Sequence, residues 1–369
     1  MENKVSKIIG FLIIFSWLAF SCNNNERNTN NNQTKNDNNQ AVTLNTIEIQ
    51  SPEYGKVFSR GDKVELKFTN FIIKENDSVR VSVNNRPLNI NNYRFENEAL
   101  VLLTDSLNSG KNRINIALNI SGQSKLAQTM IVLKASKAPV EYSYKVIARF
   151  LHDDKSYTQG LEFYNGIMYE GSGQYGESAL RKYKLETGEL LQSYNLPNNV
   201  FGEGIVIYEN KIYQLTWQSH VCYEYDLETF KLLRTFQFNT EGWGITKYKE
   251  FLVMSDGSNT LYFLNPETFT EVKRIEVYNN VGPVVYLNEL ELVEGKIFAN
   301  VYQTNDIVII NPETGFVEGI IHLTGLLDQK KVKRKPDVLN GIAYDNIKKR
   351  LFLTGKYWPE IYHVEILPK

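Results

Sequence analysis

Hydrophobic and polar residues alternate in short segments along the chain after residue 40. Alternation with a period of two is typical of half-buried β-strands. Six such segments lie before residue 137, separated by turn signals such as Arg60-Gly61-Asp62: 47–49, 63–68, 79–83, 100–103, 113–118 and 130–133. Short alternating strands at this spacing predict a β-sandwich over residues 41–137.

The predicted sandwich resembles bacterial immunoglobulin-like modules. It contains no constellation of residues that would support catalysis, so we expect a spacer or an interaction module. Residues 134–141, which include Pro139, are the predicted linker to a second domain over residues 143–369.

The second domain is built from a repeat. A unit of roughly forty to fifty residues recurs, with several predicted strands per unit and no helical pattern, which is typical of a β-propeller. The clearest marker is the turn predicted between the outer strands of each unit, found at 185–188, 227–230, 266–269 and 312–315, with the bend at 345–348 in the equivalent place near the end. We therefore predict an all-β protein with a five-bladed propeller as its second domain.

A second marker supports five units. One position leads the first strand of each unit and is occupied in turn by Gln159, Glu203, Trp243, Asn288 and Asn340. Glycine follows this position in four of the five units. Glycine is expected where strands converge and their backbones approach closely.

The next strand of each unit can be aligned on its first apolar residue. Counting five residues onward from Ile167, Ile212, Phe251, Ile297 and Leu351 gives a second set of positions: Ser172, Trp217, Asp256, Tyr302 and Lys356. Inner strands line the channel of a propeller, so both sets should meet at one mouth. Their members are polar or aromatic and differ between units, which favours a site. Two core tryptophans and a structural Glu203–Lys356 pair are the alternative.

Composition excludes several classes of function. Lysine and arginine number 41 against 42 aspartate and glutamate, so no basic surface indicates a nucleic-acid partner. The basic run at 330–335 is interpreted as a solvated loop. Four scattered histidines lack metal-ligand spacing, which argues against a zinc enzyme.

The first 22 residues predict a signal peptide with a lipid anchor. Lys4 and Lys7 precede an apolar segment at 8–20, which is shorter than the about 20 residues of a membrane-spanning helix. Leu18-Ala19-Phe20-Ser21-Cys22 then resembles a bacterial lipobox. The thiol of Cys22 is the expected lipid attachment site, with an ordinary secretory signal as the alternative. Cys222 would then have no disulfide partner.

Residues 23–40 predict a disordered tether. Ten of these eighteen residues are asparagine and none is apolar, so the segment can bury nothing that would offset its ordering entropy. We expect a monomer held by its lipid at the bacterial cell envelope, on the periplasmic or cell-surface side of a membrane.

The motifs around both sets of positions resemble the plant-type glutaminyl-peptide cyclotransferases, a family of five-bladed propellers with bacterial members. The resemblance covers about residues 143–369. It is carried by Tyr157-Thr158-Gln159-Gly160-Leu161, Phe201-Gly202-Glu203-Gly204, Glu241-Gly242-Trp243-Gly244, Ser255-Asp256-Gly257-Ser258, Leu287-Asn288-Glu289-Leu290-Glu291, Asn300-Val301-Tyr302-Gln303-Thr304, Val338-Leu339-Asn340-Gly341-Ile342-Ala343 and Thr354-Gly355-Lys356-Tyr357-Trp358-Pro359.

This resemblance implies cyclisation of an N-terminal glutamine to pyroglutamate, with release of ammonia, on peptides or proteins. The catalytic glutamate falls on Glu203, joined by Lys356 and Asn288. The substrate-binding residues fall on Gln159, Phe201, Trp217, Trp243, Tyr302 and Tyr157. The family usually has tryptophan at 302 and phenylalanine at 157. The resemblance implies no catalytic metal and allows for a structural calcium ion in the channel.

The expected chemistry assigns proton transfer to Glu203. Lys356, Gln159 or Asn288 would hold the amide oxygen, and the residues alone leave that choice open. Two other functions also stay open: a propeller that binds peptides or glycans without catalysis, and a lactonase-like hydrolase with a central metal. The hydrolase would use Glu203, Asp256, Asn288 and Asn340, but two tryptophans and a lysine fit poorly around a cation.

Overall fold

A computed structural model describes residues 45–70, 72, 77–120, 123–328, 332 and 335–369. The predicted signal peptide, the tether, Cys22 and most of the basic run lie outside the described residues. The described chain is all-β, as predicted, apart from one short 3-10 helix, η1 (Ile90–Asn92). In this part of the chain no helix has the length and apolar character that a membrane span requires.

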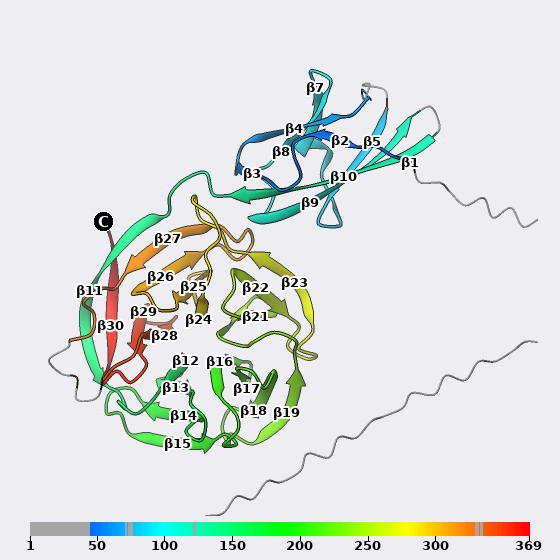
Figure 1. Cartoon of the computed structure of the whole chain (residues 1–369). Coiled ribbons are helices and arrows are strands. Elements are labelled where there is room, and N and C mark those ends of the chain that lie inside the picture. Colours follow the sequence, from blue (N-terminus) through cyan, green and yellow to red (C-terminus); the bar gives the residue numbers. More distant parts are fainter. Residues whose placement is uncertain (1–44, 71, 73–76, 121–122, 329–331, 333–334) are drawn as a thin grey trace, which may run out of the picture. The chain divides into compact units, whose positions relative to one another are not determined.

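Residues 45–134 form two sheets around one hydrophobic core (Figure 1). In β4 every second side chain is buried, and its Leu66 packs in one cluster with Ile114 and Ile131 of the other sheet. One sheet contains β1 (Asn45–Thr46), β10 (Gln123–Lys134), β9 (Gly110–Ile120), β5 (Ser78–Val83), β6 (Arg86–Pro87) and β3 (Lys56–Ser59). The other contains β2 (Ile49–Ser51), β4 (Lys63–Phe68), β8 (Ala99–Leu103) and β7 (Tyr93–Glu96).

The predicted strand at 47–49 is divided in the structure. β1 pairs with β10, whereas β2 pairs with β4 in the second sheet, so the chain changes sheets at residues 47–48. The other five predicted strands are present. β3, β6 and β7 were not predicted, since they are short and carry little alternation.

Residues 140–369 form three four-stranded antiparallel sheets and one eight-stranded sheet. The first four-stranded sheet is β12 (Thr158–Tyr164), β13 (Ile167–Ser172), β14 (Ala179–Lys184) and β15 (Leu190–Asn195). The second is β16 (Gly202–Tyr208), β17 (Lys211–Thr216), β18 (Val221–Asp226) and β19 (Leu232–Gln237). The third is β20 (Ile245–Tyr248), β21 (Phe251–Ser255), β22 (Thr260–Leu264) and β23 (Glu271–Glu276).

The eight-stranded sheet divides into two groups of four at its parallel pairing between β27 and β11. One group is β24 (Leu287–Val293), β25 (Lys296–Val301), β26 (Asp306–Ile310) and β27 (Val317–His322). The other is β28 (Leu339–Asp345), β29 (Arg350–Gly355), β30 (Glu360–Pro368) and β11 (Val140–Leu151). β11 begins inside the predicted linker and pairs with β30, the last strand of the chain.

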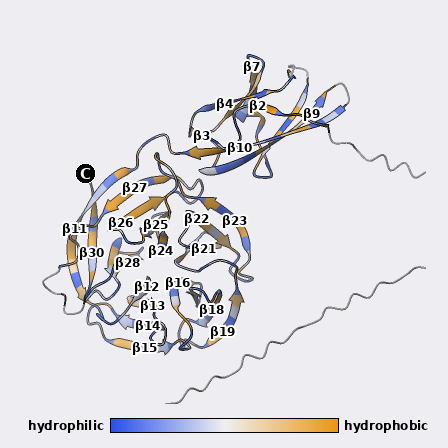
Figure 2. Cartoon of the chain, in the orientation of Figure 1, coloured by the Kyte–Doolittle hydropathy of each residue, from blue (hydrophilic) through white to orange (hydrophobic). Residues whose placement is uncertain are grey.

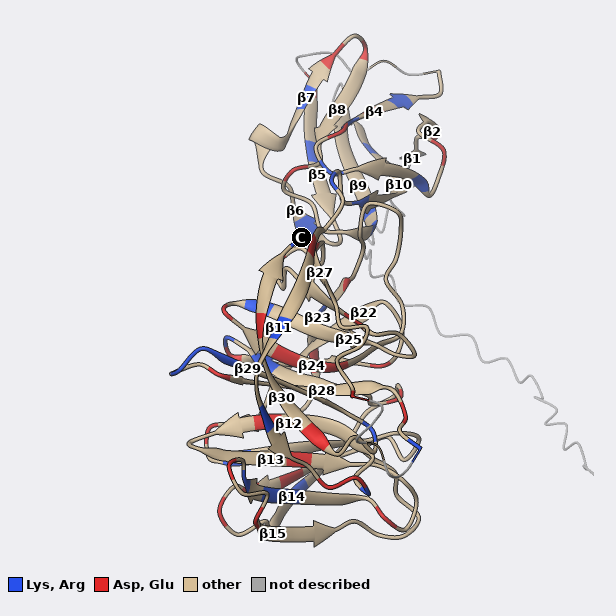
Figure 3. Cartoon of the chain, turned by 90° about the vertical axis from the view of Figure 1, so that its left-hand side faces the viewer, with Lys and Arg blue, Asp and Glu red and all other residues tan. Residues whose placement is uncertain are grey.

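The first strands of these groups form a closed ring. β12 contacts β16, β16 contacts β20, β20 contacts β24, β24 contacts β28, and β28 returns to β12. Figure 1 shows β12, β16, β24 and β28 near the centre and β15, β19, β23, β27 and β11 at the rim. Hydrophobic and hydrophilic residues are mixed along β11 and β30 in Figure 2. Acidic and basic residues are interspersed over the strands in view in Figure 3.

The predicted close approach of backbones around this ring is present at the repeated glycine of the first three units, Gly160, Gly204 and Gly244. A Cβ atom on Gly160 would lie 2.4 Å from the Ile205 nitrogen, and one on Gly244 would lie 2.0 Å from the Asn288 carbonyl oxygen. Side chains are therefore excluded at these positions. In the fourth unit Glu289 stands where the others have glycine, and its carboxylate accepts the Leu161 and Ile342 N–H groups at 3.3 and 2.9 Å.

Four of the predicted outer turns are confirmed, and the fifth is wrong. Residues 185–188, 227–230, 266–269 and 312–315 connect the third and fourth strands of their groups, but residues 345–348 connect β28 to β29, which are inner strands. The last group has no outer turn because its outer strand, β11, comes from the other end of the domain.

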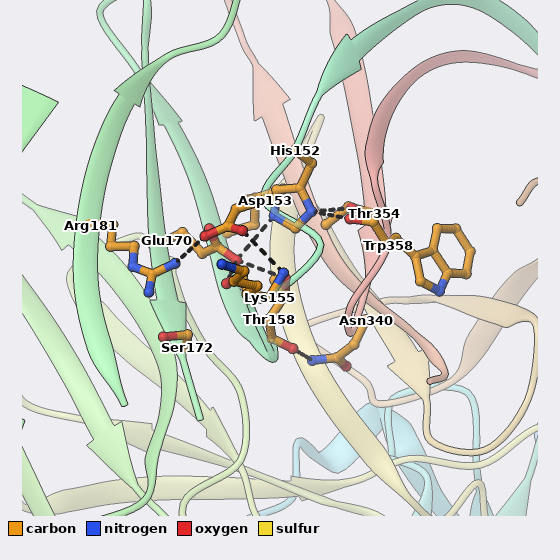
Figure 4. Close-up of polar contacts among 12 residues, drawn as sticks. His152, Asp153, Lys155, Thr158, Glu170, Ser172, Arg181, Asn340, Thr354 and Trp358 are labelled. Carbon is orange, nitrogen blue, oxygen red and sulfur yellow. Dashed lines mark hydrogen bonds and ion pairs between the residues drawn. The ribbon is translucent and has the colours of Figure 1, made fainter. Parts of the chain in front are cut away.

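A buried polar network joins the first and last groups (Figure 4). His152 lies just after β11, and its Nε2 is 3.2 Å from Glu170 Oε1 while its Nδ1 is 2.7 Å from the Trp358 carbonyl oxygen. Ser156 and Thr158 donate hydroxyl hydrogen bonds to the same carboxylate oxygen.

The protonation of this pair follows from its surroundings. Burial lowers the pKa of His152, but the Glu170 carboxylate outweighs it and the net shift is upward. Burial acts to raise the carboxyl pKa of Glu170, but His152 and the two hydroxyl donors outweigh burial and lower that pKa to about 2. Both pKa shifts favour a charged His152–Glu170 pair, which links the first and last groups.

Candidate active site

The first predicted set of positions does gather around the ring. Gln159, Glu203, Asn288 and Asn340 each occupy the second position of a first strand, in β12, β16, β24 and β28, and all four are buried. Trp243 lies two residues before β20 and is half-buried. The structure therefore brings the set together at one end of these strands.

The second set is correct at three positions and wrong at two. The backbone N–H groups of Trp217, Tyr302 and Lys356 donate to the residue that precedes each first strand, at 2.9 to 3.0 Å. Gly173 makes the same bond to Tyr157 at 2.8 Å, so Gly173 is the equivalent position in the first unit. Ser172 is one residue early.

The error has a simple cause in the strand starts. β13 and β21 begin with an apolar residue, whereas β17, β25 and β29 begin with a lysine or arginine. Alignment on the first apolar residue therefore displaced two units by one position. Ser172 instead bonds to Ala179, and Asp256 accepts hydrogen bonds from Ser258 and Tyr262.

Counting six residues from the first residue of the strand gives Gly173 in the first unit and Gly257 in the third, and glycine at both positions leaves room for aromatic rings. A Cβ atom on Gly173 would lie 2.4 Å from the Phe201 ring, and one on Gly257 would lie 2.7 Å from the Trp243 ring. Any side chain there would displace a wall of the site.

Aromatic side chains contact one another around this end of the strands. The Phe201 ring centroid lies 6.0 Å from that of Tyr157 and 5.6 Å from that of Trp217, both edge-on. Trp243 and Tyr302 make a similar contact at 5.5 Å. Edge-to-face geometry at these distances is favourable and fixes ring orientation.

Lys356 connects the two ends of this aromatic series. Its ammonium nitrogen lies 4.6 Å from the Tyr157 ring centroid and 5.1 Å from that of Tyr302. Lys356 is 2 % exposed, and burial lowers its pKa to about 8 although Glu203 and Asp337 act upward. It is therefore a cation held by ring faces, with a pKa below that of an ordinary lysine.

Glu241, which the sequence did not single out, joins the two tryptophans. Its Oε2 accepts the indole N–H of Trp217 at 2.8 Å and that of Trp243 at 3.0 Å. It is the first residue of the Glu-Gly-Trp-Gly motif, which was the available signal. Asp337, whose charge acts on Lys356, and Tyr175, whose ring lies 5.5 Å from that of Phe201, were also missed.

Glu203 is enclosed by these groups. It is 4 % exposed, and burial raises the pKa of its carboxyl well above the usual range, with Lys356 acting downward and Glu241 upward. Among the described residues none donates a hydrogen bond to its carboxylate, and Lys356 is not in ion-pair contact with it. The predicted alternative of a structural Glu203–Lys356 pair is therefore not what the geometry shows.

Side-chain amides occupy three other positions of the first set, at Gln159, Asn288 and Asn340. Asn340 Nδ2 donates to the Thr158 carbonyl at 3.0 Å, as Figure 4 shows, and to Gln159 Oε1 at 3.3 Å. The Oδ1 atoms of Asn288 and Asn340 are buried without a partner. Buried acceptors are rarely left unpaired, and unpaired ones in a site are suited to a ligand donor.

The opposite ends of the same strands line a cavity of about 890 Å³. There Lys247 donates to Glu162 Oε1 at 2.7 Å, and Glu291 accepts the Tyr344 N–H at 3.1 Å. Within the described ranges no three or more His, Cys, Asp or Glu side chains are arranged to hold a metal ion. Asp256, one of the ligands considered for a lactonase-like hydrolase, is hydrogen-bonded within its own hairpin to Ser258 and Tyr262 instead.

Fold and site together define an all-β protein in which aromatic side chains surround one buried, unpaired carboxylate, a set suited to proton transfer on a small polar group. Residues 116–366 match the family model described as glutamine cyclotransferase. The chain therefore belongs to the glutamine cyclotransferase family.

Two relatives share much of this region. The chain is 38% identical over 228 residues to a glutaminyl-peptide cyclotransferase of Arabidopsis thaliana, covering 60% of this chain and 71% of the relative. It is similar to the crystal structure of Myxococcus xanthus glutaminyl cyclase with a TM-score of 0.59 and 33% identity, covering 63% of this chain and 99% of that chain.

Proposed function

We infer that this chain is a glutaminyl-peptide cyclotransferase, which converts the N-terminal glutamine of a peptide or protein to pyroglutamate and releases ammonia. Its family membership supports this function. The observation that carries it is the buried Glu203 carboxylate, which has no hydrogen-bond donor among the described residues and lies within the aromatic set.

We propose that the closed ring is a five-bladed β-propeller and that the preceding two sheets are an immunoglobulin-like sandwich over residues 41–137. Five groups of four strands and the contacts between neighbouring first strands support the propeller. β11 supplies the outer strand of the last blade, so the propeller begins at Val140 rather than at 143. Two sheets that share one core support the sandwich.

Glu203 would move the proton during cyclisation. The substrate α-amine, with an ordinary pKa of about 7.7–8.0, is nucleophilic only when neutral. Its nitrogen attacks the side-chain amide carbon, and a C–N bond forms to close the ring. Glu203 takes a proton from that nitrogen and delivers it to the amide nitrogen, whose C–N bond breaks as ammonia leaves. A raised carboxyl pKa suits both transfers.

The other polar groups would position the reacting amide. We assign the amide oxygen to the Lys356 ammonium, which can stabilise negative charge as the carbonyl becomes tetrahedral. Asn288 Oδ1, which is buried without a donor, would accept an N–H of the substrate. Gln159 would support this set through Asn340. The rings of Phe201, Trp217, Trp243, Tyr157 and Tyr302 would enclose the folded glutamine and exclude water.

Mass spectrometry of a glutamine-initiated peptide tests this function. The purified protein should convert the N-terminus to pyroglutamate, with loss of one ammonia, in the presence of a chelator. A matched peptide with N-terminal asparagine should be unchanged, because its side chain is one carbon shorter. No conversion by a folded protein would favour a binding module without catalysis, and conversion abolished by the chelator would favour metal-dependent chemistry.

We also propose a monomeric lipoprotein of the bacterial cell envelope, anchored through Cys22 with residues 23–40 as the tether. The lipobox-like motif at 18–22 supports this proposal. A structural calcium ion in the channel stays a prediction. Partition of the wild-type protein into detergent, lost in Cys22→Ala, tests the anchor, and recovery of both proteins in the aqueous phase would contradict it.

A further inference from the structure

Glu241 occupies a distinctive place in the site. It lies two residues before Trp243, in the position that Tyr157 and Phe201 occupy before Gln159 and Glu203. Those aromatic residues form walls, whereas Glu241 offers a carboxylate. Its Oε2 accepts both indole N–H groups, and its Oε1 accepts Gln218 Nε2 at 3.3 Å.

We propose that Glu241 is a positioning residue of the cyclotransferase site: it fixes the two indole walls relative to each other and holds a negative charge beside Glu203. This inference rests on the proposed function and deepens it.

The geometric part follows from where the tryptophans come from. Trp217 follows β17 and Trp243 precedes β20, so the two indoles belong to different sheets. A partly buried indole N–H needs an acceptor, and one oxygen that accepts both sets the spacing of their edges. Trp217 then orients Phe201, and Trp243 orients Tyr302. Glu241 thus closes the aromatic series on one side, as Lys356 closes it on the other.

The electrostatic part follows from the protonation of Glu241. Burial acts to raise its pKa, but its indole and amide donors and the nearby His220 outweigh burial, and the pKa of Glu241 is lowered. It is therefore ionised at neutral pH. Its charge acts upward on the pKa of Glu203, in the same direction as burial and against Lys356. A proton-transfer group works best with a pKa near the operating pH.

Glu241→Gln removes the charge, and the neutral amide oxygen that remains is a weaker acceptor for the two indole N–H groups. We expect kcat/KM to fall by up to about 100-fold, because misplaced walls cost that much in an intramolecular reaction. The acid limb of the pH profile should move to lower pH, because loss of a neighbouring negative charge lowers the pKa of Glu203. Glu241→Asp should lose rate through its shorter reach while its acid limb moves less.

A matched control and an independent readout separate the possible failures. Gln218→Ala removes the third donor to Glu241 without touching an indole, so its acid limb should stay near that of the wild type. Nitrogen–proton spectra of the tryptophan side chains test the tether without any turnover. In Glu241→Gln the Trp217 and Trp243 indole signals should shift, while that of Trp358, which donates to the Asp337 carbonyl at 2.9 Å, should not.

Two results would overturn the proposal. Unchanged indole signals would remove the tether, and wild-type kcat/KM with an unmoved acid limb would remove the role in the reaction. If the wild type forms no pyroglutamate but Glu241→Gln shows the expected indole shifts, the proposed function is refuted and the tether remains.

Discussion

Buried charged groups have partners at one end of the first strands of the ring, whereas Glu203 and Lys356 lack them, among the described residues, at the other end. At the cavity end, Glu162 pairs with Lys247 and Glu291 accepts a backbone N–H. At the aromatic end, Glu203 is equally buried and has no donor within the part of the chain that the structure describes. Burial raises the pKa of both Glu203 and Glu291, so a raised pKa alone does not separate them. The difference lies in the partners.

The lysines repeat the contrast. Lys247, whose side chain is 37% exposed, forms an ion pair, and although burial acts to lower its pKa, Glu162 and Glu291 raise that pKa above the usual value. Lys356 has ring faces instead of a carboxylate, and burial lowers its pKa to about 8. Unpaired buried charges cost folding free energy. Such groups are paired at one end, whereas Glu203 and Lys356 are unpaired, within the described ranges, at the other. The unpaired groups therefore indicate a functional site rather than a contribution to stability.

The largest effect that sharpens this contrast is expected from Lys356→Met. Loss of the ammonium should lower kcat by about 100- to 1000-fold, the usual effect of removing one group that stabilises an oxyanion. Stability should be equal or higher, because the methionine buries no charge. Steady-state kinetics with urea unfolding measures both, and a variant that loses stability but keeps its rate would place Lys356 with the structural pairs.

The pH profile of the wild type gives the same contrast without a mutation. The Lys356 ammonium is present below its pKa, so kcat should fall as pH rises through about 8. The Glu203 carboxylate is present only above its raised pKa, so kcat should also fall on the acid side. Lys356→Met should lose the alkaline limb, and its persistence in that variant would assign the limb to another group.

Glu170→Gln tests whether the buried pair that links the first and last groups stabilises the ring. Leaving the buried His152 without its partner should lower the free energy of unfolding by about 3–5 kcal/mol. A protein that unfolds at the wild-type urea concentration would show that the network does not hold the ring. His152→Gln is the companion variant, which removes the other member of the pair.

The pair also predicts how this stability depends on pH. The carboxyl pKa of Glu170 is lowered to about 2, so its contribution is present above about pH 4.3 and is lost as pH falls toward 2. The pKa of His152 is raised, so its contribution is full below about pH 6.5 and is lost as pH rises through the raised value. The wild type minus Glu170→Gln difference in unfolding free energy should therefore be largest between about pH 4.3 and 6.5.

The smallest effect is expected from Tyr302→Trp. Tryptophan is the residue that the family resemblance leads us to expect there, and either side chain offers a face to Lys356 and an edge to Trp243. We expect KM to change a few-fold, about 1 kcal/mol of binding free energy or less, and kcat to change little. A large loss of kcat would mean that Tyr302 does more than form a wall.

Much of this fold was predictable from local pattern. The leading positions Gln159, Glu203, Asn288 and Asn340 were found because each first strand begins in the same register. The placement of β11 was not predictable in this way, since its pairing with β30 joins strands about two hundred residues apart, a relation that no local alternation encodes.

The rest of the site escaped prediction for physical reasons that differ by residue. Ser172 and Asp256 were wrong because strands that begin with a charged residue shift an alignment on apolar ones. Glu241 was overlooked because its meaning lies in two side-chain hydrogen bonds across sheets, and the sequence places Trp217 far from it. Asp337 likewise acts only through the folded geometry.

The most direct test compares Glu203→Gln with Glu291→Gln by ammonia release from a glutamine-initiated dipeptide. Both substitutions make the same chemical change in a buried carboxyl group, one unpaired at the aromatic end and one that accepts the Tyr344 N–H at the cavity end. Glu203→Gln should fold normally and lose about 100- to 10,000-fold in kcat, while Glu291→Gln keeps its rate. Equal rates in the two variants, with both folded, would contradict the assignment of proton transfer to Glu203.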